Sequence, residues 1–287
     1  MNSKKYLFIG LALTFMCSCN GNTASSTNEA SKETVVSSET IDSSEEASSS
    51  LSEEGTKKES ASSNEEDSSS FEALSMVLES GQRFNYFLYT PKEVKEGLPL
   101  ILYLHGGSGK PASQEGNLDL LTEGDGLPKF VKEKQISPTS YIVFPQLPYG
   151  KKGWSDVKVD VFTFLNNISK NLKCDNSKIS ITGHSMGGKG CWDISLSNPN
   201  LFYKIAPLSG NVTLNDDNLN KLKNKPVWAF VGTEDTIVDP QSSIDFISSL
   251  SKINTQAKIT IIEGYTHFDV PYVYLSEEYN LLSWLVE

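Results

Sequence analysis

The residues best suited to chemistry lie in the segment KISITGHSMGG, residues 178–188. Gly183, Ser185 and Gly187 match the pattern G-x-S-x-G, in which a serine occupies a sharp turn between a strand and a helix. The apolar residues before it predict a buried strand, and residues 188–196 are compatible with a helix. Because glycine leaves room for the two elements to cross, the pattern predicts a serine hydroxyl that is lifted clear of the backbone and can act as a nucleophile.

Three further motifs follow the same chemical logic. The sequence reads Leu-His-Gly-Gly-Ser-Gly at residues 104–109, directly after an apolar strand, and Gly232–Pro240 follows another strand with the spacing G-x-x-D-x-x-V-x-P. A late histidine, His267, comes after the last predicted strand. With G-x-S-x-G, these motifs in this order make residues 71–287 resemble the α/β-hydrolases, particularly compact esterases and the predicted-peptidase group.

The resemblance implies a serine hydrolase with a nucleophile, an acid and a base in that chain order. A serine hydroxyl needs a base to take its proton, and the base needs an acid that fixes its tautomer. His267 is the only histidine after Ser185 and is therefore the predicted base. His105 and His184 are expected to orient loops.

Four acidic residues are candidates for the partner of His267. Asp235 is preferred because it holds the motif position in Gly232–Pro240 and follows a strand end, where functional groups of open α/β sheets collect. Asp239 precedes a proline, which favours an extended backbone and a turn or helix-cap role. Glu234 is expected to point away from Asp235, and Asp269 is close to His267 in sequence.

Ester hydrolysis passes through an oxyanion that backbone N–H groups stabilise. Met186, the residue after the nucleophile, is expected to supply one donor, and Gly107 the other, with Ser108 as the alternative. Trp154, Tyr149 and Tyr265 are candidates for an aromatic rim that binds sugar or aryl groups, although packing beneath loops explains them equally well. Only 17 residues, 209–225, separate two strands where a lid is often inserted, so no large lid is expected.

The first 70 residues are expected to be separate from the fold. Residues 1–19 combine Lys4 and Lys5 with a short apolar run, which is typical of a targeting segment, and the run Met-Cys-Ser-Cys at residues 16–19 resembles a bacterial lipoprotein signal acylated at Cys19. An ordinary secretory peptide or a short anchor is the alternative. Residues 20–70 hold 17 serines and 12 acidic but only 3 basic residues, which predicts a disordered tether.

The composition narrows the possible partners. The chain has 287 residues and a formal net charge of −11, and residues 71–287 carry no basic cluster, so nucleic acid is not an expected partner. The three histidines are dispersed and no cysteines have ligand spacing, so neither a metal nor another cofactor is expected. Cys174 and Cys191 are predicted to be reduced, buried thiols.

The fold class follows from alternating elements. Apolar strands are predicted at 100–104, 141–144, 204–208, 226–231 and 259–262, with helices between them and a hairpin before them. This order predicts a doubly wound, mostly parallel sheet without a large cap domain, in a domain of residues 71–287. The predicted activity is cleavage of carboxylic esters outside the cytoplasm, on small-molecule or carbohydrate-linked substrates. A peptidase, an acyltransferase and a non-catalytic binding lipoprotein remain alternatives.

Overall fold

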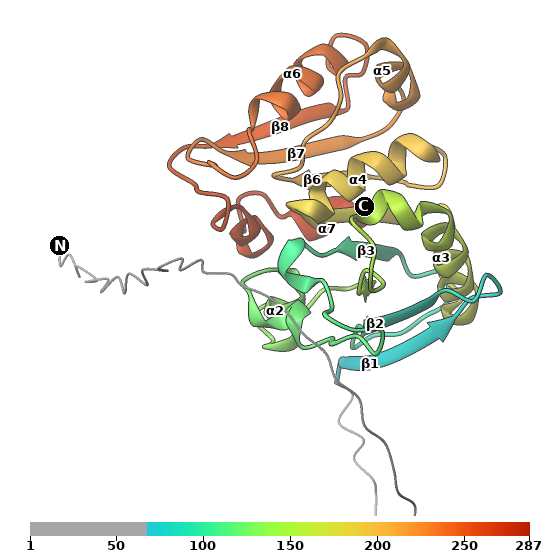
Figure 1. Cartoon of the computed structure of the whole chain (residues 1–287). Coiled ribbons are helices and arrows are strands. Elements are labelled where there is room, and N and C mark those ends of the chain that lie inside the picture. The colour runs from blue at the N-terminus through green and yellow to red at the C-terminus, as the bar shows by residue number, and fades with distance from the viewer. Residues whose placement is uncertain (1–67) are drawn as a thin grey trace, which may run out of the picture. The chain divides into compact units, whose positions relative to one another are not determined.

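One eight-stranded sheet organises residues 68–287, the part of the chain that the computed structural model describes (Figure 1). The predicted targeting segment with Cys19, and residues 20–67 of the predicted tether, lie outside the described residues. Within residues 68–287, no helix is both long and apolar enough to cross a bilayer.

The sheet is mixed but mostly parallel, in the order β1-β2-β4-β3-β5-β6-β7-β8. The strands β4, β3, β5, β6, β7 and β8 run parallel, while β2 is antiparallel to both β4 and β1. In Figure 1 the cyan hairpin strand β1 forms one edge of the sheet, and the orange strand β8 forms the other. The strands are β1 (Ser70–Val77), β2 (Arg83–Thr90), β3 (Leu100–Leu104), β4 (Tyr141–Pro145), β5 (Ile179–His184), β6 (Ile205–Leu208), β7 (Val227–Gly232) and β8 (Ala257–Ile262).

Helices cover both faces of the sheet and form two apolar cores. The larger core includes residues of α3, α4, α5 and α6, and the other includes residues of α2, η3 and α7. The helical elements are η1 (Gly107–Gly109), α1 (Leu120–Glu123), α2 (Leu127–Lys132), η2 (Trp154–Val157), α3 (Lys158–Leu172), α4 (Met186–Ser197), α5 (Asp216–Leu222), α6 (Gln241–Leu250), η3 (Val270–Leu275) and α7 (Leu281–Val286).

The central strands are buried on both faces, as their composition requires. All five residues of β3, LILYL, are buried, which is the pattern of a parallel strand covered by helices on each side. In α3 the buried residues Val161, Phe164, Leu165 and Ile168 follow the helical spacing of one apolar face. Phe164 packs against Phe84 and Tyr86 of β2, so this helix also covers the hairpin.

The predicted fold class is confirmed. The structure differs from the sequence prediction in short helical elements. The segment 209–225, which we expected to be a connection without a lid, contains the seven-residue helix α5, begun by the Asn215 side chain accepting the Asn218 N–H. The elements α1 and η3 were not predicted, because segments of four to six residues give too little periodicity. Cys174 and Cys191 are free and buried, as expected.

Helix α4 crosses the end of β3 so closely that it has no room for a side chain at Gly187. A Cβ at that position would collide with the Leu104 carbonyl, and one at Gly183 would also press against Leu104. These two glycines therefore set how near the serine between them lies to the sheet.

We expect Gly187→Ala to destabilise the fold by about 1–3 kcal/mol, because α4 must move away from β3 to admit the methyl group. Urea unfolding measures the difference in the free energy of unfolding between this variant and the native protein. Gly124→Ala is the matched control, since Gly124 has φ −93° and a Cβ added there would meet no atom within 4 Å. Equal unfolding midpoints for the two variants would contradict the close crossing.

Candidate active site

Ser185 occupies a strained backbone turn between β5 and α4. Its φ of 59° and ψ of −120° lie in a region that residues with a side chain rarely adopt, at a cost on the order of 1–3 kcal/mol. Two hydrogen bonds hold the turn: the Ser185 N–H donates to Leu208 O over 3.0 Å, and the Lys189 N–H donates to Ser185 O over 2.9 Å. The residue is only partly buried.

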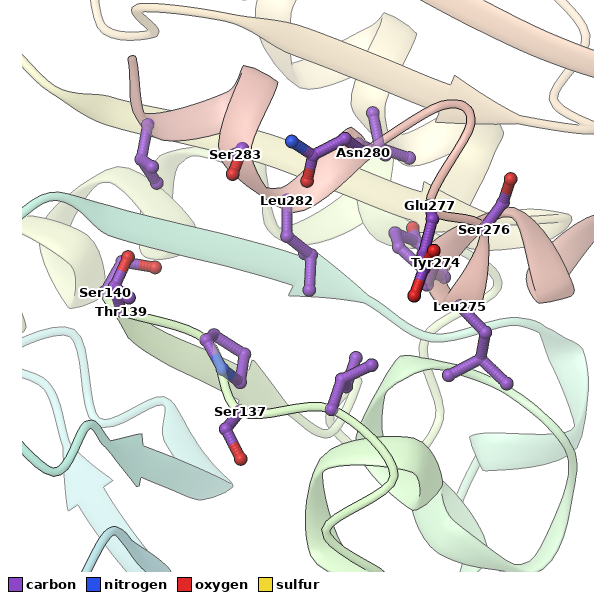
Figure 2. Close-up of a pocket in the computed structure, with 14 residues that line it drawn as sticks. Ser137, Thr139, Ser140, Tyr274, Leu275, Ser276, Glu277, Asn280, Leu282 and Ser283 are labelled. Atoms are coloured by element: carbon purple, nitrogen blue, oxygen red, sulfur yellow. The ribbon is translucent and has the colours of Figure 1, made fainter.

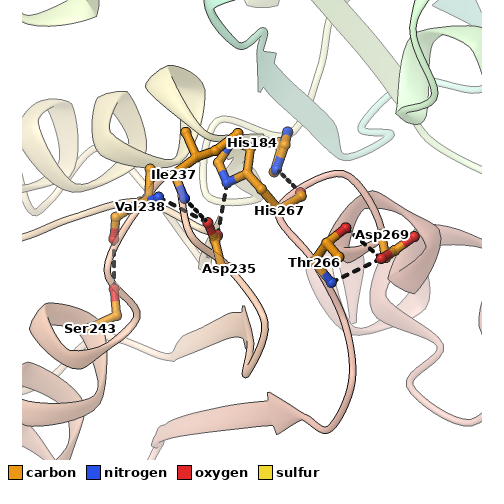
Figure 3. Close-up of polar contacts among 9 residues, drawn as sticks. His184, Asp235, Ile237, Val238, Ser243, Thr266, His267 and Asp269 are labelled. Carbon is orange, nitrogen blue, oxygen red and sulfur yellow. Dashed lines mark hydrogen bonds and ion pairs between the residues drawn. The ribbon is translucent and has the colours of Figure 1, made fainter. Parts of the chain in front are cut away.

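His267 and Asp235 form a buried pair at the same edge of the sheet (Figure 3). His267 Nδ1 lies 2.8 Å from Asp235 Oδ2, and the two side chains are only 4% and 1% exposed. Asp235 lies three residues beyond the end of β7, and His267 lies five residues beyond the end of β8. Neighbouring parallel strands therefore bring together residues that are 32 positions apart.

The surroundings of Asp235 favour its charged form. Burial raises the pKa of this carboxyl, but hydrogen bonds from the Val238 N–H, from His267 and from the Ile237 N–H outweigh burial, so the pKa lies below its ordinary value. The two amides donate to Oδ1 over 2.9 and 3.0 Å, which leaves Oδ2 for the imidazole. A carboxylate held in this way fixes the Nδ1–H tautomer of its histidine.

The other acidic candidates are engaged elsewhere. Asp239 is exposed and accepts the Gln241 N–H in a turn just before α6, the turn role considered for it. Asp269 accepts hydrogen bonds from the backbone and hydroxyl of Thr266 within its own loop. Glu234 is exposed. Among residues 68–287, Asp235 is the only carboxylate within ion-pair distance of the His267 ring.

His184 connects the serine turn to the loop that carries His267. Its Nε2–H donates to the His267 carbonyl over 2.8 Å, and the two ring centroids are 4.5 Å apart (Figure 3). Burial is the main reason that the pKa of His184 is lowered to about 3, so this ring stays neutral and remains a donor. No hydrogen bond joins Ser185 Oγ to His267 among the described residues; such contacts often tighten only when substrate binds.

Two backbone N–H groups close to Ser185 in the chain or in the neighbouring loop have no partner in the described part of the chain. The loop after β3 passes directly beside Ser185, since a Cβ at Gly106 would lie 3.4 Å from Ser185 Cβ. The Gly107 and Met186 N–H groups donate to no acceptor among residues 68–287. Met186 also begins α4, so its N–H is at the positive end of the helix dipole. This arrangement can bind an oxyanion.

His105 fixes the backbone of that loop. Its Nδ1–H donates to Gly106 O over 2.6 Å, and its Nε2 accepts the Leu147 N–H over 2.9 Å, so both ring nitrogens are used in the neutral form. Burial lowers the pKa of His105 to about 4. Gln146, which sequence reasoning missed, adds a hydrogen bond from Nε2 to Gly109 O over 2.9 Å. Only its place directly after an apolar strand could have singled it out.

Of the two roles considered for Trp154, the structure supports packing beneath a loop and not the substrate-binding aromatic rim. Its side chain is 1% exposed, and Nε1 donates to His105 O over 3.1 Å, so it supports the loop from beneath. Tyr265 is half-buried, and its carbonyl accepts the Glu234 N–H over 2.9 Å. Tyr149 is 50% exposed. A role of Tyr265 in substrate binding stays a prediction.

A cavity elsewhere in the fold takes no part in this site. It has a volume of about 250 Å³ and lies between the segment before β4 and the segment that joins η3 to α7, where Ser137, Glu277 and Asn280 line it (Figure 2). None of the residues described above as candidates for catalysis contributes to it. Residues 68–287 also contain no cluster of His, Cys, Asp or Glu side chains able to hold a metal ion.

Comparison with known proteins identifies the class of this fold. Residues 146–272 match the dienelactone hydrolase family, a stretch that contains Ser185, Asp235 and His267. No curated protein matches the sequence.

Solved structures of esterases are similar to this chain. A thermostable esterase superposes with a TM-score of 0.61 at 22% identity over 75% of this chain, which spans 62% of the length of that protein. The feruloyl esterase module from Clostridium thermocellum superposes with a TM-score of 0.58 at 13% identity, over 73% of this chain and 86% of the module. S-formylglutathione hydrolase from Staphylococcus aureus superposes with a TM-score of 0.56 at 17% identity, over 76% of this chain and 97% of that protein. These similarities show that the chain has the α/β-hydrolase fold.

Because burial keeps His105 and His184 neutral, we expect the free energy of unfolding to fall as the pH is lowered. Because their folded-state pKa values, about 4 for His105 and about 3 for His184, lie below the ordinary 6.5, the unfolded chain binds more protons as the pH falls from 6.5 towards 4. We expect His105 alone to contribute on the order of 3 kcal/mol to the loss. Urea unfolding at several pH values measures this loss of stability. His105→Gln should make the free energy of unfolding depend less steeply on pH. An NMR titration in which either ring charges above pH 6 would contradict this expectation.

Proposed function

We propose that this protein is a serine hydrolase that cleaves carboxylic esters, with Ser185 as nucleophile, His267 as base and Asp235 as the acid that orients it. The observation that carries the proposal is the buried 2.8 Å contact between His267 and Asp235, at the edge of the sheet where Ser185 sits in its strained turn. The matched family and the similar esterase structures support the same reaction class.

The mechanism follows from the proton positions. Asp235 holds the proton of His267 on Nδ1, so Nε2 is free to take the proton of the Ser185 hydroxyl as the oxygen attacks the ester carbonyl. The Met186 and Gly107 N–H groups stabilise the resulting oxyanion, at about 3–4 kcal/mol for each donor. When the carbonyl re-forms, the C–O bond to the alcohol breaks, and the alcohol leaves with the proton from His267.

The second half of the reaction repeats these steps with water. His267 takes a proton from a water molecule that attacks the acyl-enzyme, and it returns that proton to Ser185 as the acid is released. His184 remains neutral throughout because of its low pKa, so it does not repel the imidazolium that forms on His267. Its hydrogen bond to the His267 carbonyl holds the base loop in position during both steps.

The open surroundings of Ser185 favour substrates that are not long-chain lipids. The connection between β6 and β7 adds only the short helix α5, which is too small for a large hydrophobic lid. Ester groups attached to carbohydrate suit an open site. The similarity to a feruloyl esterase module, whose structure was determined with sinapinate, is compatible with an aromatic acyl group. We also propose a location outside the cytoplasm with a lipid anchor at Cys19, on the sequence pattern at residues 16–19.

A fluorophosphonate probe tests the nucleophile. We expect stoichiometric labelling of the native protein and complete loss of labelling in Ser185→Ala, because only an activated serine reacts at neutral pH. Ser197→Ala, on the exposed far end of the same helix, is the control and should label normally.

Failure of the native protein to react would instead favour a binding protein on a hydrolase scaffold. If the native protein labels, turnover of short-chain p-nitrophenyl esters against peptide substrates separates an esterase from a peptidase. Transfer of the acyl group to an added alcohol in preference to water would identify an acyltransferase.

A further inference from the structure

A polar cavity of about 320 Å³ lies beside the candidate active site and has no role in the mechanism above. Three segments form it: the start of β2 with Arg83 and Asn85, the loop around Gly116, and the residues after β4, including Gln146 and Tyr149. No acidic side chain lines the cavity.

The register of the sheet places this cavity at the same edge as Ser185. Tyr86 of β2 pairs with Pro145 at the carboxyl end of β4, so the start of β2 lies where the parallel strands end. Strands β4 and β3 separate β2 from β5, and adjacent strands are about 4.8 Å apart, so the start of β2 is about 14 Å from Ser185 across the sheet. That span exceeds a small acyl group but suits linked sugar rings.

The walls of the cavity are fixed before any ligand binds. Gln146 Nε2 donates to Asn117 O and to Gly109 O, and Asn85 Nδ2 donates to Glu115 O over 2.7 Å. Gly116, with φ +78°, lies against both amides, so a side chain there would displace them. Since Gly109 belongs to η1 in the loop beside Ser185, the cavity wall and the predicted oxyanion loop share one hydrogen-bond network.

Arg83 gives the cavity its charge. It is the only arginine among the 25 basic residues of the chain, and strand alternation places its side chain on the same face of β2 as Asn85. No carboxylate among residues 68–287 lies within ion-pair distance of its guanidinium, whereas several exposed lysines are paired. A guanidinium presents a planar fork that fits a carboxylate with two hydrogen bonds.

Tyr149 offers a second kind of contact. Its side chain is 50% exposed at the cavity, so an apolar ring face and a hydroxyl are both available to a ligand. A charged fork beside an aromatic ring, with amides around them, matches a ligand that has a carboxylate, hydroxyl groups and a ring with apolar C–H faces. An acidic sugar has all three.

We propose that this cavity is a subsite for an acidic sugar, a uronic acid unit of the carbohydrate that carries the ester. The carboxylate binds Arg83 and the sugar ring lies on Tyr149, while the ester reaches Ser185. Only the link to the ester rests on the proposed hydrolase function; binding of the acidic sugar does not.

Calorimetry with two oligosaccharides tests the subsite directly. The probes are xylotriose that bears one glucuronic acid and unsubstituted xylotriose, titrated into the full chain. We expect the acidic probe to bind at least about 10-fold more tightly, as a charge-assisted pair of hydrogen bonds provides. Arg83→Gln should remove that preference, and Arg83→Lys should retain part of it. Lys252→Gln is the control, because it makes the same change of charge at an exposed position far from the cavity in the strand order. It should retain the whole preference.

Three results would overturn the subsite: equal binding of the two probes, no binding of either, or native-like binding by Arg83→Gln. Inorganic phosphate that binds the cavity as well as the acidic tetrasaccharide does, and in an Arg83-dependent way, would also overturn it, because this result would identify a simple anion site. Hydrolysis of p-nitrophenyl acetate, whose acyl group is too short to reach the cavity, should be unchanged in Arg83→Gln. Absence of this hydrolysis in the native protein would refute the esterase proposal, while the calorimetry still decides the subsite.

Discussion

The strained backbone at Ser185 is the feature on which the rest of the site depends. A non-glycine residue adopts φ 59° and ψ −120° only if its neighbours hold it there. Here β5 ends in a hydrogen bond to Leu208 O, α4 begins one residue later, and the absence of side chains at Gly183 and Gly187 lets the two elements meet over Leu104. The free energy stored in this turn is offset by the buried sheet around it.

The base and its acid are fixed by a second set of backbone contacts. A Cβ at Gly232 would collide with the Tyr265 carbonyl, so the end of β7 and the loop after β8 touch without side chains between them. His184 then ties this loop to the serine turn through the His267 carbonyl. The backbone thus connects the loops that carry the three candidate catalytic residues, and a side-chain contact joins two of them, His267 and Asp235. A shift of one loop would displace the others.

Much of this organisation was predictable because it depends on local patterns. The buried run of β3 and the helical spacing of α3 gave the fold class, and the glycines around Ser185 gave the turn. The choice of Asp235 over Asp239 also rested on a local signal, its place in the motif after β7. Short elements such as α1 and η3 escaped prediction because tertiary packing, rather than periodicity, stabilises them.

Features that depend on the packing of distant segments could not be predicted. The sequence left two roles open for Trp154, an aromatic rim or packing beneath a loop, and only its contact with His105, 49 residues earlier, distinguishes them. The same holds for Gln146 and Arg83. They line one cavity only because β2, β4 and the loop after β3 pack together in the fold. Sequence motifs indicated the candidate catalytic residues, whereas the pairing of strands determines which other residues lie around them.

The most direct measurement is a crystal structure of the protein after reaction with a fluorophosphonate. We expect a covalent bond from phosphorus to Ser185 Oγ, with one phosphonyl oxygen about 3 Å from the N–H groups of Met186 and Gly107, and with His267 still paired to Asp235. An adduct on another residue, or a phosphonyl oxygen turned away from both N–H groups, would contradict the central claim that this serine turn and its loops form a preorganised catalytic site.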